Sequence, residues 1–243
     1  DWDRVFTEYS PDVIHHLAAI NGTRRFHKEA DLVVDVNVNG TRNALMYAQK
    51  YQCRLVFYSS PESFGEQESM PLSNDSDSLF PPAHLHQRHS YGASKHIGEI
   101  LCQFEVRNGL DVRIARPCNV YGSRLHGDEN GQVVSMMMNA NPIVVHGDGL
   151  QTRSLTWIGD VIQGLLAIND LDGLEGMAFN LGSTVETTML DLAKEISNLR
   201  GVEIVHSGPN HGDSKRRLPD VSMNEIISWE AKTSLKEGLD QLL

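Results

Sequence analysis

The chain has 243 residues, of which 40% are apolar and 22% charged, and these values are ordinary for a globular protein with a buried core. Acidic residues outnumber basic ones by 32 to 21, so the formal net charge of −11 argues against a nucleic-acid-binding surface. No apolar run reaches bilayer-spanning length, and three scattered cysteines without a C-x-x-C pair predict reduced thiols in a soluble cytoplasmic protein.

Short apolar runs alternate with longer amphipathic segments through the first half of the chain. The predicted elements are, in chain order, a helix at 2–9, a strand at 12–17, a helix at 28–51, a strand at 54–58, a helix at 91–107 and a strand at 112–115. This order predicts an α/β fold with a doubly wound parallel sheet, in which functional groups gather at the carboxyl ends of the strands.

The alternation loosens after residue 121 and then resumes. The predicted elements are a loop at 122–131, a helix at 133–139, a strand at 143–146, an extended segment at 152–157, a helix at 160–169, a strand at 178–181, a helix at 187–199 and a last helix from Ser234. Two helix starts carry capping signals, because Thr188 precedes Asp191 and Ser234 precedes Glu237 at capping-box spacing.

Ser60 follows the strand at 54–58, and Tyr91 and Lys95 open the helix at 91–107. Lys95 lies one helical turn after Tyr91, on the same face. A phenol is a poor base at neutral pH, but a nearby ammonium is expected to lower its pKa, and a serine hydroxyl can hold the reacting oxygen. These three groups suit hydride transfer at a carbinol carbon, although a Tyr-x-x-x-Lys pair alone also fits an ordinary surface helix.

His84, His86 and His89 form an H-x-H-x-x-H segment that superficially resembles a zinc site. No cysteine or carboxylate stands nearby at ligand spacing, and we therefore predict no metal site here.

Several short motifs resemble the extended short-chain dehydrogenase/reductase family, in its nucleotide-sugar epimerase/dehydratase branch. The resemblance covers essentially the whole chain, and its specificity comes from the order of the motifs. They are His16-Leu17-Ala18-Ala19, Asn37-Val38-Asn39-Gly40-Thr41, Ser59-Ser60-Pro61-Glu62, Tyr91 with Lys95, Arg116-Pro117-Cys118-Asn119-Val120-Tyr121-Gly122, Gly147-Asp148-Gly149 followed by Gln151-Thr152-Arg153, and Arg216-Arg217-Leu218-Pro219-Asp220.

The resemblance implies an NAD cofactor on the amino-terminal sheet and a nucleotide sugar, UDP- or dTDP-linked, on the carboxyl-terminal part. By the same resemblance, Tyr91 is the general acid/base, Lys95 lowers its pKa and holds the nicotinamide ribose, and Ser60 binds the reacting oxygen. The implied cofactor contacts are Leu17, Ala18, Ala19, Asn37, Tyr91, Lys95 and Pro117. The implied substrate contacts are Asn119, Arg153 and Arg217, where a guanidinium suits phosphate oxygens.

The Gly-rich turn that cradles the cofactor pyrophosphate in this family is absent from the sequence. We therefore expect a Rossmann-like, amino-terminally truncated sheet at 1–122, to which 158–182 returns, and a smaller substrate-binding α/β part at 123–243. The helices at 28–51 and 91–107 are candidates for a homodimer interface, as is common among members of the family.

The reaction on the sugar stays open at this point. All branches begin with oxidation at sugar C4, and dehydratases of the family add an Asp–Glu pair where this chain has Pro61 and Glu62. We expect an epimerase/dehydratase type of enzyme. The alternatives are a UDP-glucuronate decarboxylase, whose Glu and Arg match Glu62 and Arg217, and a non-catalytic nucleotide-binding relative. Glu62 could also be a structural carboxylate that accepts hydrogen bonds from backbone amides.

Overall fold

The centre of the molecule is a four-stranded parallel sheet in the order β1-β2-β3-β8, which confirms the predicted parallel α/β fold. Its strands are β1 (Val13–His16), β2 (Arg54–Tyr58), β3 (Val112–Pro117) and β8 (Ala178–Leu181). The structure is a computed structural model, and it describes residues 1–85, 89–127, 131–208 and 215–243. Strand β8 comes from the second half of the chain, so the two halves share one sheet.

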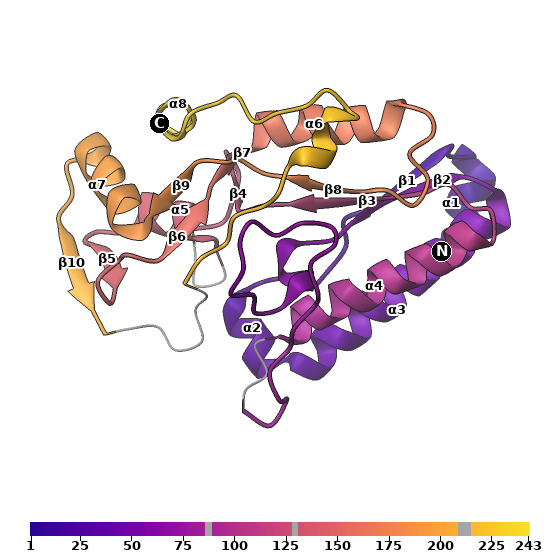
Figure 1. Ribbon diagram of the computed structural model, residues 1–243, viewed down its shortest axis with the longest axis horizontal. Helices are drawn as coiled ribbons and strands as arrows, with labels where there is room; N and C mark the ends of the chain where they lie inside the picture. The colour runs from indigo at the N-terminus through magenta and orange to yellow at the C-terminus, as the bar shows by residue number, and fades with distance from the viewer. Residues whose placement is uncertain (86–88, 128–130, 209–214) are drawn as a thin grey trace.

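Helices cover both faces of this sheet (Figure 1). On one face, α3 (Ala30–Tyr51) and α4 (Ser90–Arg107) lie side by side, with α1 (Trp2–Tyr9) beside α3. On the other face lies α6 (Ile158–Asp170). Side chains alternate along each strand, so that Phe57 packs toward α3 and α4 while its neighbour Val56 packs toward α6.

The smaller carboxyl-terminal part has its own apolar cluster, which is built around Ile143, Val145, Leu192 and Ile196. Its elements are α5 (Val133–Asn139), β5 (Ile143–His146), α7 (Met189–Arg200), β10 (Ile204–Ser207) and α8 (Leu235–Asp240). Strands β5 and β10 pair in parallel. Two further pairs, β4 (Val120–Tyr121) with β7 (Thr156–Trp157) and β6 (Thr152–Ser154) with β9 (Glu186–Thr188), link this part to the main sheet.

Three helix starts differ by two residues from the expected ones, and one of them is α6, which begins at Ile158 rather than at residue 160. The helix expected from residue 28 begins at Ala30, and the short helix α2 (Thr23–Lys28) before it was not predicted; Glu29, at φ −130°, separates the two. The helix expected from residue 187 begins at Met189, since the preceding residues form β9. Both predicted caps are confirmed at Thr188 and Ser234.

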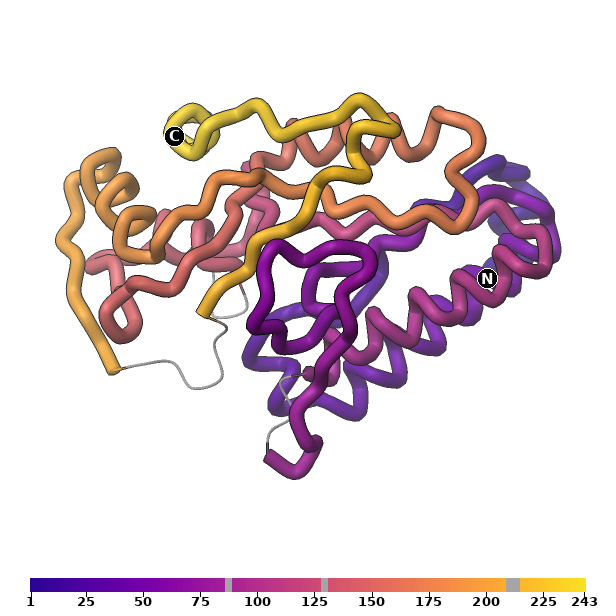
Figure 2. Tube along the Cα trace, in the orientation of Figure 1, coloured from indigo at the N-terminus to yellow at the C-terminus, as the bar shows by residue number. Residues whose placement is uncertain are grey.

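Residues 215–220 return from the smaller part to the main sheet (Figure 2). Leu72 and Pro219 form a β-bridge, and the Asn180 side chain at the end of β8 donates to the carbonyl oxygens of Leu72 and Asp220 at 3.0 and 2.9 Å. This return carries Arg217 to the carboxyl end of the sheet. No helix among the described residues is long and apolar enough to cross a membrane.

Candidate functional site

Ser60 lies two residues after the end of β2, where it caps the short 3-10 helix η1 (Pro61–Phe64) and accepts a hydrogen bond from the backbone N–H of Glu62 at 3.3 Å. The first turn of α4 lies close against η1. A Cβ atom placed on Gly92 would come within 2.3 Å of the Glu62 carbonyl oxygen, so a glycine is needed there. This close approach places the Ser60 hydroxyl beside the Tyr91 side chain, on whose pKa it acts.

Tyr91 is held in place by Phe26 of α2, whose ring stacks on the Tyr91 ring at 4.8 Å with an interplanar angle of 11°. Burial raises the pKa of Tyr91 to about 12, the contact with Ser60 acts in the opposite direction, and the charge of Glu62 raises it. The pKa of Tyr91 therefore lies above its usual value in the ligand-free protein, mainly because its phenol is desolvated. The lowering effect of Lys95 on this pKa stays a prediction.

Lys95 lies one turn further along α4 and is only 3% exposed. Its Nζ donates to the Tyr58 carbonyl oxygen at 2.6 Å and lies 5.6 Å from the centroid of the Tyr91 ring. Burial lowers the pKa of Lys95 to about 8. The sheet edge thus places a hydroxyl, a phenol and an amine together, as the sequence predicted.

Four of the residues predicted to contact NAD lie at the carboxyl ends of β1 and β3, whereas Asn37 lies on α3 and Tyr91 and Lys95 lie on α4. Leu17 is 58% exposed and Ala18 is exposed, while Ala19 and Pro117 are half-buried. Apolar surface beside a buried amine suits a flat ring with an attached ribose, so these residues fit a nicotinamide nucleotide. Their contact with the cofactor stays a prediction.

Asn37 is 2% exposed, and its side chain holds the segment after β1 in place. Its Oδ1 accepts from the backbone N–H of Ile20 at 2.7 Å, and its Nδ2 donates to the Ser94 hydroxyl at 3.0 Å. Asn37 therefore ties this segment to α4 next to Lys95. This supporting role is visible in the structure, whereas direct binding of a cofactor by Asn37 stays a prediction.

Glu62 faces Arg217, which reaches the site from the returning segment. The Arg217 Nη2 lies 3.2 Å from the Glu62 Oε2, and its Nη1 donates to the Gly65 carbonyl oxygen at 2.6 Å. Arg217 is 3% exposed, and its Nε has no hydrogen-bond partner among the described residues. The observed partner of the Glu62 carboxylate is thus a guanidinium group, and both the catalytic and the structural role of Glu62 stay predictions.

Asn119 and Arg153 lie on adjoining segments. The Asn119 Nδ2 donates to the Ser154 carbonyl oxygen at 3.2 Å, and the Arg153 Nη1 donates to the carbonyl oxygen of Thr152 at 2.7 Å. The backbone N–H of Thr152 in turn donates to the Lys215 carbonyl oxygen at 3.0 Å. The segment that carries Arg217 therefore runs from β6, which holds Arg153, to η1, which holds Glu62.

A buried ionic network behind the site was not predicted from the sequence. Arg116 donates to both carboxylate oxygens of Glu99, from Nε at 2.8 Å and from Nη2 at 2.7 Å, and the Ser59 hydroxyl donates to the same carboxylate. The available signal was the spacing of Glu99, which lies four residues after Lys95 and on the same helix face.

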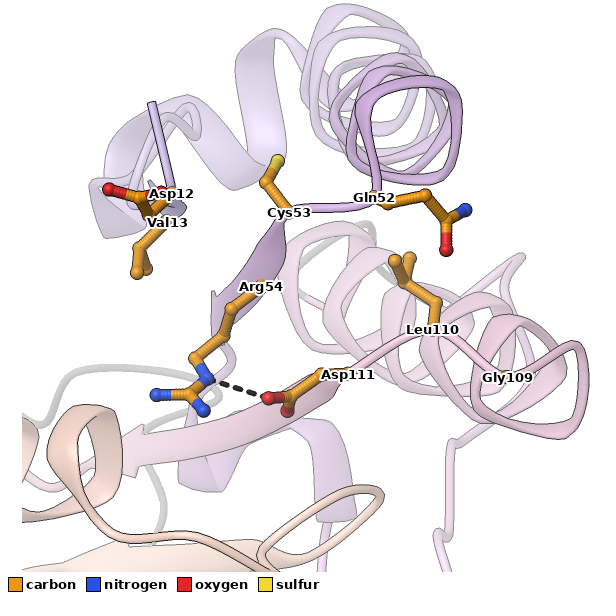
Figure 3. A pocket seen from close by; sticks show the side chains of 8 residues that line it. All are labelled: Asp12, Val13, Gln52, Cys53, Arg54, Gly109, Leu110 and Asp111. Atoms are coloured by element: carbon orange, nitrogen blue, oxygen red, sulfur yellow. Dashed lines mark hydrogen bonds and ion pairs between the residues drawn. The ribbon is translucent and has the colours of Figure 1, made fainter. Parts of the chain in front are cut away.

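A pocket of about 410 Å³ lies at the opposite, amino-terminal end of β1, β2 and β3 (Figure 3). Arg54 points into it but already pairs with Asp111, from Nε to Oδ2 at 2.6 Å. None of the residues predicted to be catalytic lines this pocket. We therefore place the functional site at the carboxyl edge.

No group of three or more metal-ligand side chains gathers within the part of the chain that the structure describes. His86 lies outside the described residues, so the absence of a metal from the H-x-H-x-x-H segment stays a prediction.

Comparison with known proteins gives one consistent picture. A model of the NAD dependent epimerase/dehydratase family matches residues 1–182. UDP-glucuronic acid decarboxylase 1 of Arabidopsis thaliana is 33% identical over 240 residues, which cover 96% of this chain and 54% of that protein. UDP-N-acetyl-alpha-D-glucosaminuronate decarboxylase of Bacillus cytotoxicus is 31% identical over 245 residues, which cover 96% of this chain and 75% of that protein.

Among solved structures, UDP-glucose 4-epimerase of Thermotoga maritima, crystallised with UDP-glucose, superposes with a TM-score of 0.89 at 26% identity. The match covers 99% of this chain and 78% of that one. This chain thus spans about half the length of the Arabidopsis relative and about three quarters of the other two proteins.

Proposed function

Because the chain belongs to the NAD dependent epimerase/dehydratase family, we propose that the full-length protein is an NAD-dependent enzyme that modifies a nucleotide sugar through transient oxidation at sugar C4. The observation that carries this proposal is the meeting of Ser60, Tyr91 and Lys95 at one sheet edge. A protein that only bound nucleotides would have no use for this combination of groups.

The cofactor chemistry is simple to state, since bound NAD accepts a hydride from the sugar carbon. Leu17, Ala18 and Pro117 would offer it an apolar surface, and Lys95 would hold its ribose hydroxyls. Hydrogen bonding from the buried Lys95 ammonium to a ligand would satisfy a donor that now bonds only to the Tyr58 carbonyl oxygen among the contacts the structure describes.

Tyr91 is the proton acceptor in this proposal. The phenolate oxygen of Tyr91 takes the proton of the sugar C4 hydroxyl. The Ser60 hydroxyl donates a hydrogen bond to the oxygen of this sugar hydroxyl and so orients it. A pKa of about 12 leaves Tyr91 protonated at neutral pH in the ligand-free protein. Ligand binding must therefore lower this pKa, and an ammonium at Lys95 directed toward the phenol is the group available to do so.

Arg153, Asn119 and Arg217 are the proposed contacts of the nucleotide sugar. A guanidinium group binds phosphate oxygens in a two-pronged geometry, and a UDP- or dTDP-linked diphosphate would offer such oxygens. The segment that carries Arg217 connects β6 to η1, so a ligand along it would extend from Arg153 to the reacting centre.

The test is a chromatography–mass spectrometry assay of the full-length protein with NAD and a panel of UDP-, dTDP-, GDP- and CDP-sugars. An isomer of unchanged mass at a new retention time would identify an epimerase, and loss of water would identify a dehydratase. If every sugar were recovered unchanged while nucleotide still bound, the non-catalytic alternative would replace this proposal.

A second candidate is the decarboxylation of a nucleotide-linked uronic acid, and the Glu62–Arg217 pair favours it. A buried guanidinium beside the reacting centre offers a site for a sugar carboxylate, and both sequence relatives described above are named uronate decarboxylases. In the same assay, loss of carbon dioxide from a UDP-uronic acid would select this candidate. Arg217→Gln should then weaken binding of the uronate more than that of the neutral sugar.

We further propose a cytoplasmic homodimer. Exposed apolar side chains form one stripe on α3, with Leu32, Val36 and Met46, and another on α4, with Ile100 and Phe104. A second copy of the chain packed across these stripes would cover both. Light scattering should give twice the monomer mass, and Phe104→Glu should reduce the measured mass to that of one monomer.

The three buried free cysteines agree with a reducing compartment such as the cytoplasm.

A further inference from the structure

Glu99 occupies the same face of α4 as Tyr91 and Lys95, one turn beyond the lysine. Its carboxylate accepts hydrogen bonds from Ser59, directly after β2, and from Arg116, the penultimate residue of β3. The Glu99 carboxylate therefore links α4, the end of β2 and β3, and each of these three elements carries or adjoins a residue of the site.

We infer that Glu99 and Ser59 are positioning residues, which hold Ser60 at the distance from Tyr91 and Lys95 that proton transfer requires. This inference rests on the proposed function. Ser59 is covalently adjacent to Ser60, so the bond from its hydroxyl to Glu99 fixes the backbone from which the Ser60 side chain projects. A displacement of about 1 Å at a reacting group can lower a rate by as much as a hundredfold.

Stability alone does not explain this network. The side chains of Glu99 and Arg116 are 13% and 7% exposed, so both charges have lost most of their water. A buried ion pair of this kind contributes little more stability than well-packed apolar residues of the same size. Its directional hydrogen bonds do, however, fix one geometry, which is what a catalytic pair needs.

Glu99 also acts on the charge of Lys95. Burial lowers the pKa of Lys95, and Cys102 and the negative charge of Glu99 raise it. The other titratable groups that face the amine are Tyr91 and Cys102 on the same helix and His16 on β1. From β2 the amine meets the Tyr58 carbonyl oxygen and the Phe57 ring, whose centroid lies 5.2 Å from Nζ. Loss of the Glu99 charge should therefore lower the pH at which Lys95 gives up its proton.

The first test is kinetic and uses Ser59→Ala in the full-length enzyme, because loss of one hydroxyl leaves the ion pair intact. We expect kcat to fall about tenfold, with KM for the sugar and Kd for NAD nearly unchanged. Ser59→Thr, which keeps the hydroxyl, should restore kcat. Ser197→Ala is the matched control, since that hydroxyl donates to the Val202 carbonyl oxygen far from the site. An unchanged kcat in Ser59→Ala would overturn the inference.

The second test needs no turnover, so it separates this inference from the proposed function. NMR titration of the 15N-labelled Lys95 amine, identified by its absence in Lys95→Arg, should show a lower midpoint in Glu99→Gln than in the wild type. An unchanged midpoint would overturn the inference even if no sugar were turned over. If Glu99→Gln failed to fold, the Ser59→Ala kinetics would decide alone.

Discussion

Lys95 Nζ donates a hydrogen bond of 2.6 Å to the carbonyl oxygen of Tyr58, the last residue of β2. Tyr58 stands two residues before Ser60, so this bond holds the Lys95 amine at the sheet edge near Ser60 without any ligand. A ligand hydroxyl would therefore accept a hydrogen bond from an ammonium group whose position is already fixed. The site is pre-organised in this respect.

Tyr91→Phe removes the group that we assign to proton transfer. We expect turnover to fall by about a hundredfold or more, because a positioned acid/base contributes typically that much. The ring that stacks on Phe26 is kept, so the thermal midpoint should not change. Sugar binding, measured by calorimetry, should stay close to that of the wild type. Full activity in this variant would refute the proposed mechanism.

Gly92→Ala should damage the site although alanine normally favours a helix by about 1 kcal/mol over glycine. The added Cβ would lie 2.3 Å from the Glu62 carbonyl oxygen, so α4 and η1 must separate. We expect a lower thermal midpoint and slower turnover. Gly208→Ala is the control, because its Cβ would meet nothing within 4 Å. Equal midpoints for the two variants would contradict the close approach.

His16 makes stability depend on pH. Burial, followed by the charge of Lys95, lowers the pKa of His16 from 6.5 to about 4. The unfolded chain therefore binds more protons between these values, so the free energy of unfolding falls as pH decreases from about 6.5 to 4. The shift corresponds to a loss on the order of 3 kcal/mol.

In His16→Phe this part of the pH dependence should disappear. The hydroxyl of Thr41 would lose its contact with the imidazole but would still donate to the Asn37 carbonyl oxygen at 2.8 Å. Urea unfolding at pH 7 and pH 4.5 measures the difference, with His84→Gln, at an exposed position, as the control. An identical loss in wild type and His16→Phe would show that other groups cause it.

Arg113 is fully buried and holds the end of α6. Its guanidinium donates to the carbonyl oxygens of Ile168 and Asn169 at 2.5 and 3.1 Å and pairs with Asp111. Arg113→Leu removes this donor from the buried Ile168 carbonyl oxygen, whereas Arg54 still donates to Asn169 and pairs with Asp111, so we expect the free energy of unfolding to fall by about 1–3 kcal/mol. Urea unfolding measures this cost, and the exposed Arg4→Leu should scarcely change the midpoint.

The regular elements were well predicted because their residue patterns are local. Arg54–Tyr58 is a strand that is apolar after its first residue, and this strand, Val133–Asn139 and Ala178–Leu181 have the bounds that the sequence indicated. The break at Glu29 was missed, since the apolar spacing continues across it while the backbone does not. Strand order predicted that Ser60 lies at the carboxyl edge of the sheet, whereas its grouping with Tyr91 and Lys95 rested on the helical spacing of that pair and on the family resemblance.

Electrostatic details could not be predicted in this way. The pKa of Tyr91 depends on how completely the surrounding elements bury its phenol, and sequence spacing to Lys95 carries no such information. The Glu62–Arg217 pair likewise depends on a chain return that no local pattern marks. Both properties arise from tertiary packing.

Glu62 and Arg217 are separated by 155 residues of chain. During synthesis Ser60, Tyr91 and Lys95 leave the ribosome long before Arg217 does. The Glu62 carboxylate therefore has no guanidinium partner until the segment at 215–220 has been synthesised. A chain that stopped before this segment would keep the four strands of the main sheet but would lack the Arg217 side of its site.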